Sequence, residues 1–118
     1  MQREMPFLQE LKQAEYIDAS HVDGFSSYRD AVLFCWENRR KGKGMVERLD
    51  QALCASIIGL HAPHFSRCVN RKTKSPMDLK TDLLPAFEAY TGNRAVTQYL
   101  SKITSTTSLE EIQARRAA

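Results

Sequence analysis

Apolar positions recur every three or four residues along most of the chain, the spacing of helices that bury one face. The pattern predicts helices at about residues 1–18, 26–41, 45–58, 62–70, 82–90, 93–102 and 108–116. Little of the chain alternates polar and apolar residues as a half-buried strand does. The fold class is therefore all-α, a compact helical domain with extra N- and C-terminal helices.

Local signals set the ends of these helices. Gly24 breaks a turn-like segment over residues 19–25, and Ser26 or Ser27 can then cap the next helix with Asp30 in its first turn. Gly59 stands where glycine commonly ends a helix. We expect a central domain over residues 27–103, preceded by an N-terminal helix and connector at 1–26 and followed by a tail or helix at 104–118.

The charge distribution says more than the net charge of +3. Residues 39–80 hold ten Lys and Arg against three Asp and Glu, a balance of +7, so the rest of the chain carries −4. A basic central segment between acidic ends suits a protein that lays one face on a polyanion. The 118 residues are enough for one domain with a modest core.

The cysteines indicate a reduced protein without a metal site. Cys35, Cys54 and Cys68 are separated by 19 and 14 residues, and no pair has the close spacing of a zinc site. Each stands among apolar residues, as a buried reduced cysteine does. The chain has no apolar run of bilayer length and no secretion signal at its start, so we expect a cytoplasmic protein without cofactor or membrane contact.

The most informative segment is residues 51–71, QALCASIIGLHAPHFSRCVNR. A helix-turn-helix needs a small residue in its first helix, which the second helix crosses closely, and Ala55 is in that place. Four residues later Gly59 allows the positive φ of the turn. Leu60, Phe65 and Cys68 are the apolar anchors of the second helix, since Phe65 and Cys68 lie three residues apart on one face.

The other residues of the second helix, about 62–70, and the residue after it point outward together. They are Ala62, Pro63, His64, Ser66, Arg67, Asn70 and Arg71. None is acidic and none is a bulky hydrocarbon, which suits the major groove of DNA. The alternative is an ordinary helical pair with a solvated polar face.

Residues 59–67, GLHAPHFSR, resemble the turn and recognition helix of lambda-repressor-like helix-turn-helix regulators of temperate phages and prophages. Segments 83–87 and 90–100 resemble downstream parts of the same class, so the likeness covers about residues 27–103. It implies a sequence-specific regulator of transcription that binds double-stranded DNA as a homodimer or higher homo-oligomer, its recognition helix in the major groove.

Candidate contacts follow from side-chain chemistry. Arg67 is the first candidate for base contact, because arginine bonds guanine bidentately, and His64 and Ser66 are further candidates. Candidates for phosphate contact are Gln51, Asn70, Arg71, Lys72 and Lys74, and the basic run 39–43 is another. The alternative for each of these residues is an ordinary solvated side chain without a DNA contact.

Other functions compete with DNA binding. Trp36 offers a stacking platform for single strands, but its helical spacing with Val32 and Leu33 favours the core. Cys68 and His64 are four residues apart, yet no acidic residue stands near to orient the histidine and the two belong to opposite faces, so we expect no enzyme. The rival function is a protein-binding module, an antirepressor or host-takeover factor, on a helix-turn-helix scaffold with apolar terminal helices as its working surfaces.

Overall fold

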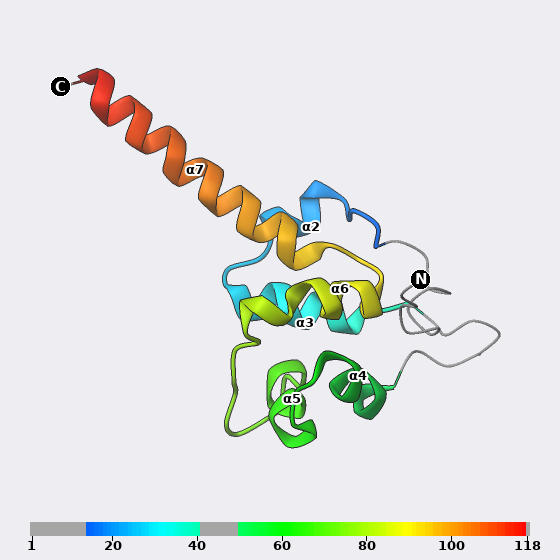
Figure 1. Cartoon of the computed structure of the whole chain (residues 1–118). Helices are drawn as coiled ribbons and strands as arrows, with labels where there is room; N and C mark the ends of the chain where they lie inside the picture. Colours follow the sequence, from blue (N-terminus) through cyan, green and yellow to red (C-terminus); the bar gives the residue numbers. More distant parts are fainter. Residues whose placement is uncertain (1–13, 41–49, 118) are drawn as a thin grey trace, which may run out of the picture.

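Helices make up the regular structure of the protein (Figure 1). The computed structural model describes residues 14–40 and 50–117. Its elements are α2 (Ala19–Asp23), α3 (Tyr28–Glu37), α4 (Gln51–Ile58), α5 (Ala62–Val69), the 3₁₀ helix η1 (Thr81–Leu83), α6 (Leu84–Thr91) and α7 (Ala95–Ala117). These residues contain no β-strand, only an isolated bridge between Glu15 and Asn93. The predicted all-α class is confirmed for the described part.

The helix α3 lies at the centre of the fold and contacts α5, α6 and α7. Trp36 on α3 is 5% exposed, and its ring meets Phe65 of α5 edge-on at 5.2 Å. It also stacks on Tyr90 of α6 at 6.4 Å. Aromatic pairs at such distances add to the free energy gained from burying their area. The tryptophan is thus a core residue, as its helical spacing predicts.

The start of α3 forms where the sequence predicts it. Ser27 is the N-cap, and its hydroxyl accepts a hydrogen bond from the Asp30 backbone N at 3.1 Å. The Asp30 carboxylate in turn accepts from the Ser26 backbone N at 3.1 Å and from the Ser26 hydroxyl. These bonds satisfy backbone donors that the first turn of a helix leaves free, so the helix begins here.

The first residue of α4 differs from the prediction. Asp50 has an extended backbone and caps the helix by accepting from the Leu53 backbone N at 3.1 Å, so the helix begins at Gln51. The prediction of one helix through 45–58 is wrong at Asp50; residues 45–49 lie outside the described ones. Leu53, in the first turn of α4, is 42% exposed.

The N-terminal segment is also built differently from the prediction. Of the helix expected at 1–18, residues 1–13 lie outside the described part and residues 14–18 are not helical. Instead, the Gln98 side chain accepts from the Ile17 backbone N at 2.8 Å and donates to its carbonyl at 3.0 Å. The expected turn at 19–25 contains α2, because the Asp18 side chain accepts from the Ser20 backbone N and caps a helix.

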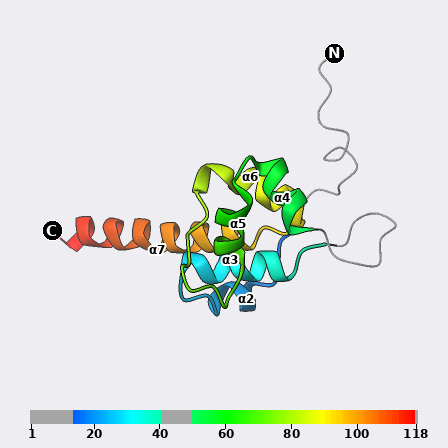
Figure 2. The ribbon, with the colours of Figure 1, turned by 90° about the horizontal axis from the view of Figure 1, so that it is seen from below.

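The helix α7 is continuous from Ala95 to Ala117, so the separate helices predicted at 93–102 and 108–116 are wrong. The segment 95–117 contains no glycine or proline, the residues that most often interrupt a helix. The first turns of α7 pack on α3 and α2, and the rest extends away from the other helices (Figures 1 and 2). The molecule therefore has two distant ends, the α7 tip and the α4–α5 pair.

Candidate nucleic-acid interface

The helices α4 and α5 are joined by a tight connection. Gly59 ends α4 with φ of 79°, the left-handed conformation that glycine adopts without steric cost. The Leu60 backbone N then bonds back to the Ala55 carbonyl at 3.0 Å. Ala55, Phe65 and Cys68, the residues expected to face inward, are each at most 1% exposed. Leu60 is partly buried against the same core.

The first turn of α5 is open to solvent. Ala62, Pro63 and His64 are exposed, and the His61 side chain makes no capping hydrogen bond. The rings of His61 and His64 meet edge-on with their centroids 5.0 Å apart. Pro63 fits here because the first turn of a helix needs no backbone N–H bond from it. This end of α5 therefore presents its side chains outward.

The last turn of α5 is held by Arg29, a residue that the sequence analysis missed. Its Nη1 donates to the carbonyls of Arg67 at 3.0 Å, Cys68 at 3.4 Å and Met77 at 3.1 Å, and its Nη2 donates to the Asn70 carbonyl at 2.9 Å. A helix leaves its last carbonyls unbonded and carries a partial negative charge there, so a guanidinium is well suited to this end. Because Arg29 lies on α3, it fixes the orientation of α5 on the core.

Several predicted contact residues are bonded within the chain. The Arg67 Nε donates to the Ser75 carbonyl at 2.6 Å, and this side chain is half-buried. The Asn70 Nδ2 donates to the Ser66 hydroxyl at 2.6 Å. Arg71 pairs with Glu37 of α3 through two bonds of 2.6 and 2.8 Å, and this hydrogen bonding raises the pKa of the guanidinium. These groups brace the end of α5 and the loop that follows it.

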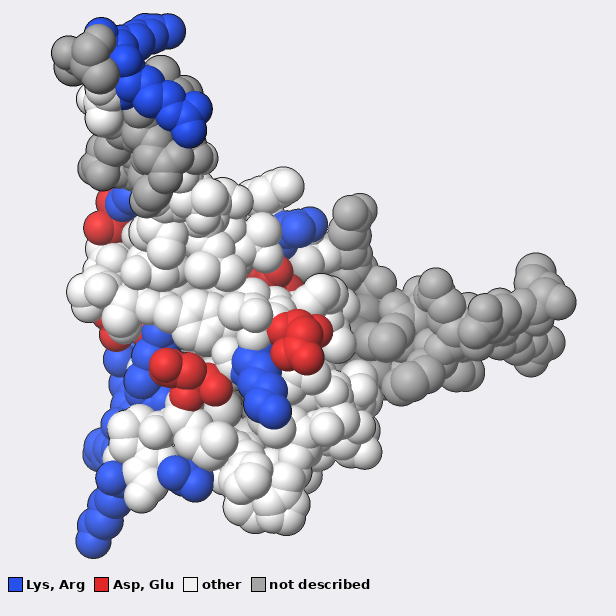
Figure 3. Space-filling view, turned by 60° about the vertical axis from the view of Figure 1, so that its left-hand side comes forward, with Lys and Arg blue, Asp and Glu red and all other residues white. Residues whose placement is uncertain are grey.

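The lysines of that loop are open. Lys72 and Lys74 are exposed and form no ion pair with any other described residue. A shallow hollow of about 480 Å³ beside them is lined by Ser66, Asn70, Arg71, Lys72 and Thr73. Figure 3 shows Lys and Arg side chains along the lower left edge of the molecule, at the end away from the α7 tip. Four of the predicted contact residues, Ser66, Asn70, Arg71 and Lys72, thus line one hollow, whereas Gln51 lies half-buried at the start of α4.

The basic run 39–43 is partly structural. The Arg39 guanidinium stacks over the Trp36 ring at 4.0 Å and donates to the Trp36 carbonyl at 2.9 Å. Arg40 donates through Nη2 to the Ala89 carbonyl at 3.3 Å, and burial lowers the pKa of its guanidinium. Residues 41–43 lie outside the described part. Arg39 therefore packs against the end of α3, and Arg40 ties the segment after α3 to α6, roles that the charge pattern did not reveal.

The three cysteines are free and buried, as predicted. Burial raises the pKa of each thiol, that of Cys54 to about 12, which keeps the thiols protonated. Cys68 is 1% exposed whereas His64 is exposed on the outer side of α5, so the two do not form a nucleophile and base. Within residues 14–40 and 50–117, no three His, Cys, Asp or Glu residues come together as a metal site would require.

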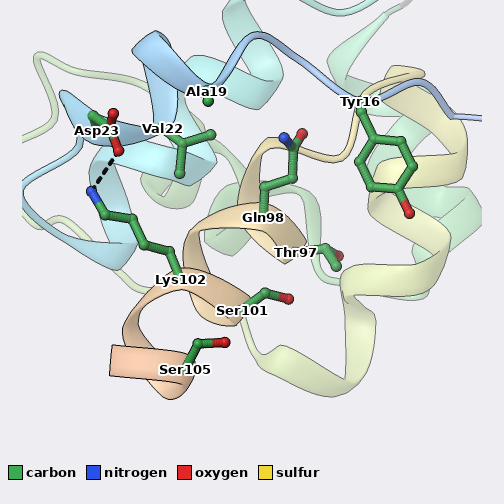
Figure 4. A pocket seen from close by; sticks show the side chains of 9 residues that line it. All are labelled: Tyr16, Ala19, Val22, Asp23, Thr97, Gln98, Ser101, Lys102 and Ser105. Atoms are coloured by element: carbon green, nitrogen blue, oxygen red, sulfur yellow. Dashed lines mark ion pairs between the residues drawn. The ribbon is translucent and has the colours of Figure 1, made fainter. Parts of the chain in front are cut away.

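A second surface lies between α2 and the first half of α7 (Figure 4). It is a groove of about 500 Å³, with Val22 and Ser101 among its lining residues. Tyr16 at its rim is 73% exposed, and Asp23 and Lys102 form an ion pair of 2.9 Å across it. This groove is far from the exposed turn of α5, because α2 and α7 pack on the opposite side of α3 (Figure 1).

Comparison with known proteins does not assign the chain to a family. Across the described residues, no helix combines the length and apolar character needed to cross a membrane. No family model, curated protein or solved structure matches the chain.

Proposed function

We propose that the protein is a sequence-specific regulator of transcription that binds double-stranded DNA, with α4 and α5 as a helix-turn-helix and α5 in the major groove. The observation that carries the proposal is the outer side of α5. Its first turn is exposed, the helix contains no carboxylate, and it leads directly into the exposed Lys72 and Lys74. The major groove accepts one helix, and an acidic residue there would repel the flanking phosphates.

The two parts of this surface have different roles. Lys72 and Lys74 neutralise phosphates and supply affinity without sequence preference. Side chains of α5 face the base edges and supply specificity. Arg29 supports both, because it ties the end of α5 and the start of the following loop to α3.

A single α5 spans only part of a recognition site. The lambda-repressor-like regulators that residues 59–67 resemble pair about a twofold axis. Pairing places two such helices in successive major grooves, about 34 Å apart. We therefore expect a homodimer or higher homo-oligomer on DNA. Three free buried cysteines fit a reducing compartment, and we expect a cytoplasmic location and no cofactor.

The test is a fluorescence-anisotropy titration of genomic duplex fragments at several salt concentrations. Removing two phosphate contacts in the Lys72→Ala/Lys74→Ala variant should weaken binding and reduce the slope of log K against log salt by about 2. The matched control is Arg115→Ala/Arg116→Ala, which removes two exposed charges at the α7 tip and should leave the slope unchanged. Wild-type protein that binds no duplex at low salt would refute the proposal.

The groove between α2 and α7 favours the second candidate, a protein-binding module. Its exposed tyrosine and mixed polar and apolar lining are typical of a surface that holds another protein. One variant distinguishes the two candidate functions. Tyr16→Ala should leave duplex binding intact if α5 is the working surface, and should abolish partner capture if the groove is.

A further inference from the structure

Two of the exposed side chains at the start of α5 are apolar. Ala62 and Pro63 are both exposed, and neither side chain can donate or accept a hydrogen bond. Arg67, the first candidate for base contact, is half-buried and already donates its Nε to the Ser75 carbonyl. The exposed groups at this end of α5 therefore include a methyl group and a proline ring beside the rings of His61 and His64.

Base-pair chemistry limits what such groups can recognise. In the major groove, guanine, cytosine and adenine present hydrogen-bonding atoms, and only thymine adds an apolar group, its 5-methyl. An apolar side chain set against a donor or acceptor leaves that atom desolvated and unpaired, which is unfavourable. An exposed apolar pair such as Ala62 and Pro63 would therefore favour thymine over the other bases.

We infer that Ala62 and Pro63 are specificity-determining residues that read the 5-methyl groups of thymine. The inference rests on the proposed DNA-binding function and adds the class of site, duplexes with thymine opposite the first turn of α5. His61 and His64 flank the pair, and their rings pack edge-on against each other. Arg67 is then a positioning residue that braces the loop carrying Lys72 and Lys74.

The test begins with selection of duplexes from a random library by the full chain. Each thymine of the selected site is then replaced in turn by uracil, which removes the methyl group and leaves the hydrogen-bonding atoms unchanged. Burial of one methyl group is worth about fourfold in affinity, so a uracil opposite Ala62 should weaken binding by about that factor. Uracil outside the site should have no effect.

Ala62→Gly identifies the residue that makes the contact. This variant should bind the thymine and uracil duplexes equally, because the contacting methyl group is gone from the protein. The readout is a ratio within one protein, so a loss of overall stability does not affect it. The control is Ala52→Gly, an exposed alanine in the first turn of α4, which should keep the fourfold ratio.

The outcomes separate the inference from the function on which it rests. If no duplex is enriched, the proposed function itself fails. If a duplex is enriched but uracil substitution leaves its affinity unchanged, the function stands and the inference is overturned. The assignment to Ala62 is overturned if the fourfold ratio survives Ala62→Gly, because Pro63 or another residue then reads the methyl group.

Discussion

The two ends of α5 are built in opposite ways. At its last turn, Arg29 bonds three carbonyls of residues 67–70, and Arg71 just beyond is paired with Glu37. At its first turn, Ala62, Pro63 and His64 are exposed, and the cap residue His61 makes no side-chain bond to the helix. One end is fixed to the core by charged hydrogen bonds, and the other is left open to solvent.

This difference indicates a division of labour along one helix. A group that reads a ligand must be free of intramolecular partners, yet its position must be fixed by other groups. In α5 the fixing groups lie about two turns from the exposed ones. Substitutions at the fixed end should therefore mainly lower the free energy of unfolding. Substitutions at the open end should mainly weaken ligand recognition.

The largest effect is expected for Arg29→Ala. The change removes four hydrogen bonds from a charged donor and leaves partly buried carbonyls without partners, so we expect a loss of about 3 kcal/mol in the free energy of unfolding. Urea denaturation followed by circular dichroism measures it. The control Arg116→Ala, which removes an exposed charge at the α7 tip, should change stability by less than about 0.5 kcal/mol. Equal effects of the two would contradict the role given to Arg29.

A smaller loss is expected for Gly59→Ala, at the connection leading into the open end. A Cβ there would meet no atom within 4 Å, so the cost is that of a left-handed backbone alone, about 1–2 kcal/mol. Gly24→Ala is the matched control, because Gly24 has φ of −83°, which alanine adopts freely. Thermal unfolding should separate the two variants; a larger loss at Gly24 would show that the backbone conformation is not decisive.

Tyr28 gives the contact between α3 and the segment after α5 a pH dependence. Its hydroxyl donates to the Leu79 carbonyl at 2.6 Å, and burial raises the pKa of this phenol from 10.0 to about 12. An acid whose pKa is raised on folding stabilises the protein below its unfolded pKa, and this contribution is lost between pH 10 and 12. Tyr28→Phe should lose about 1 kcal/mol at pH 8. Urea midpoints at pH 8 and 11.5 should then show a smaller fall in the variant than in wild type, and parallel falls would contradict this.

Many helix ends can be predicted from the local sequence. The cap Ser27 bonds a backbone group only three residues away, and Gly59 and Gly92 end α4 and α6 with positive φ. Such signals are readable because cause and effect lie within one turn. The errors at α2 and α7 arose where a local pattern had two outcomes. Asp18 caps a helix in a segment that resembles a turn, and Ser108 begins a capping-box pattern that lies inside a helix.

The candidate site could be predicted only in part. The inward positions of Phe65 and Cys68 follow from helical spacing, and both are buried. The roles of Arg29 and Glu37 could not be foreseen, because their bonds join residues 34 to 48 positions apart in the chain. No spacing rule reports which carbonyl or guanidinium will lie opposite a side chain after folding. DNA binding by this surface stays a prediction.

The smallest effect is expected for Glu37→Gln, which tests whether the fixed end restrains a DNA contact. The ion pair with Arg71 is largely exposed, so its loss should change the unfolding free energy by at most about 0.5 kcal/mol. On a selected duplex at low salt, however, the released Arg71 can reach a phosphate, and we expect affinity to rise about threefold. Asp23→Asn removes the same charge from the ion pair with Lys102 on the opposite side of α3, and should give a smaller gain. Equal gains in the two variants would mean that net charge alone is responsible; a gain confined to Glu37→Gln would place Arg71 at the DNA backbone.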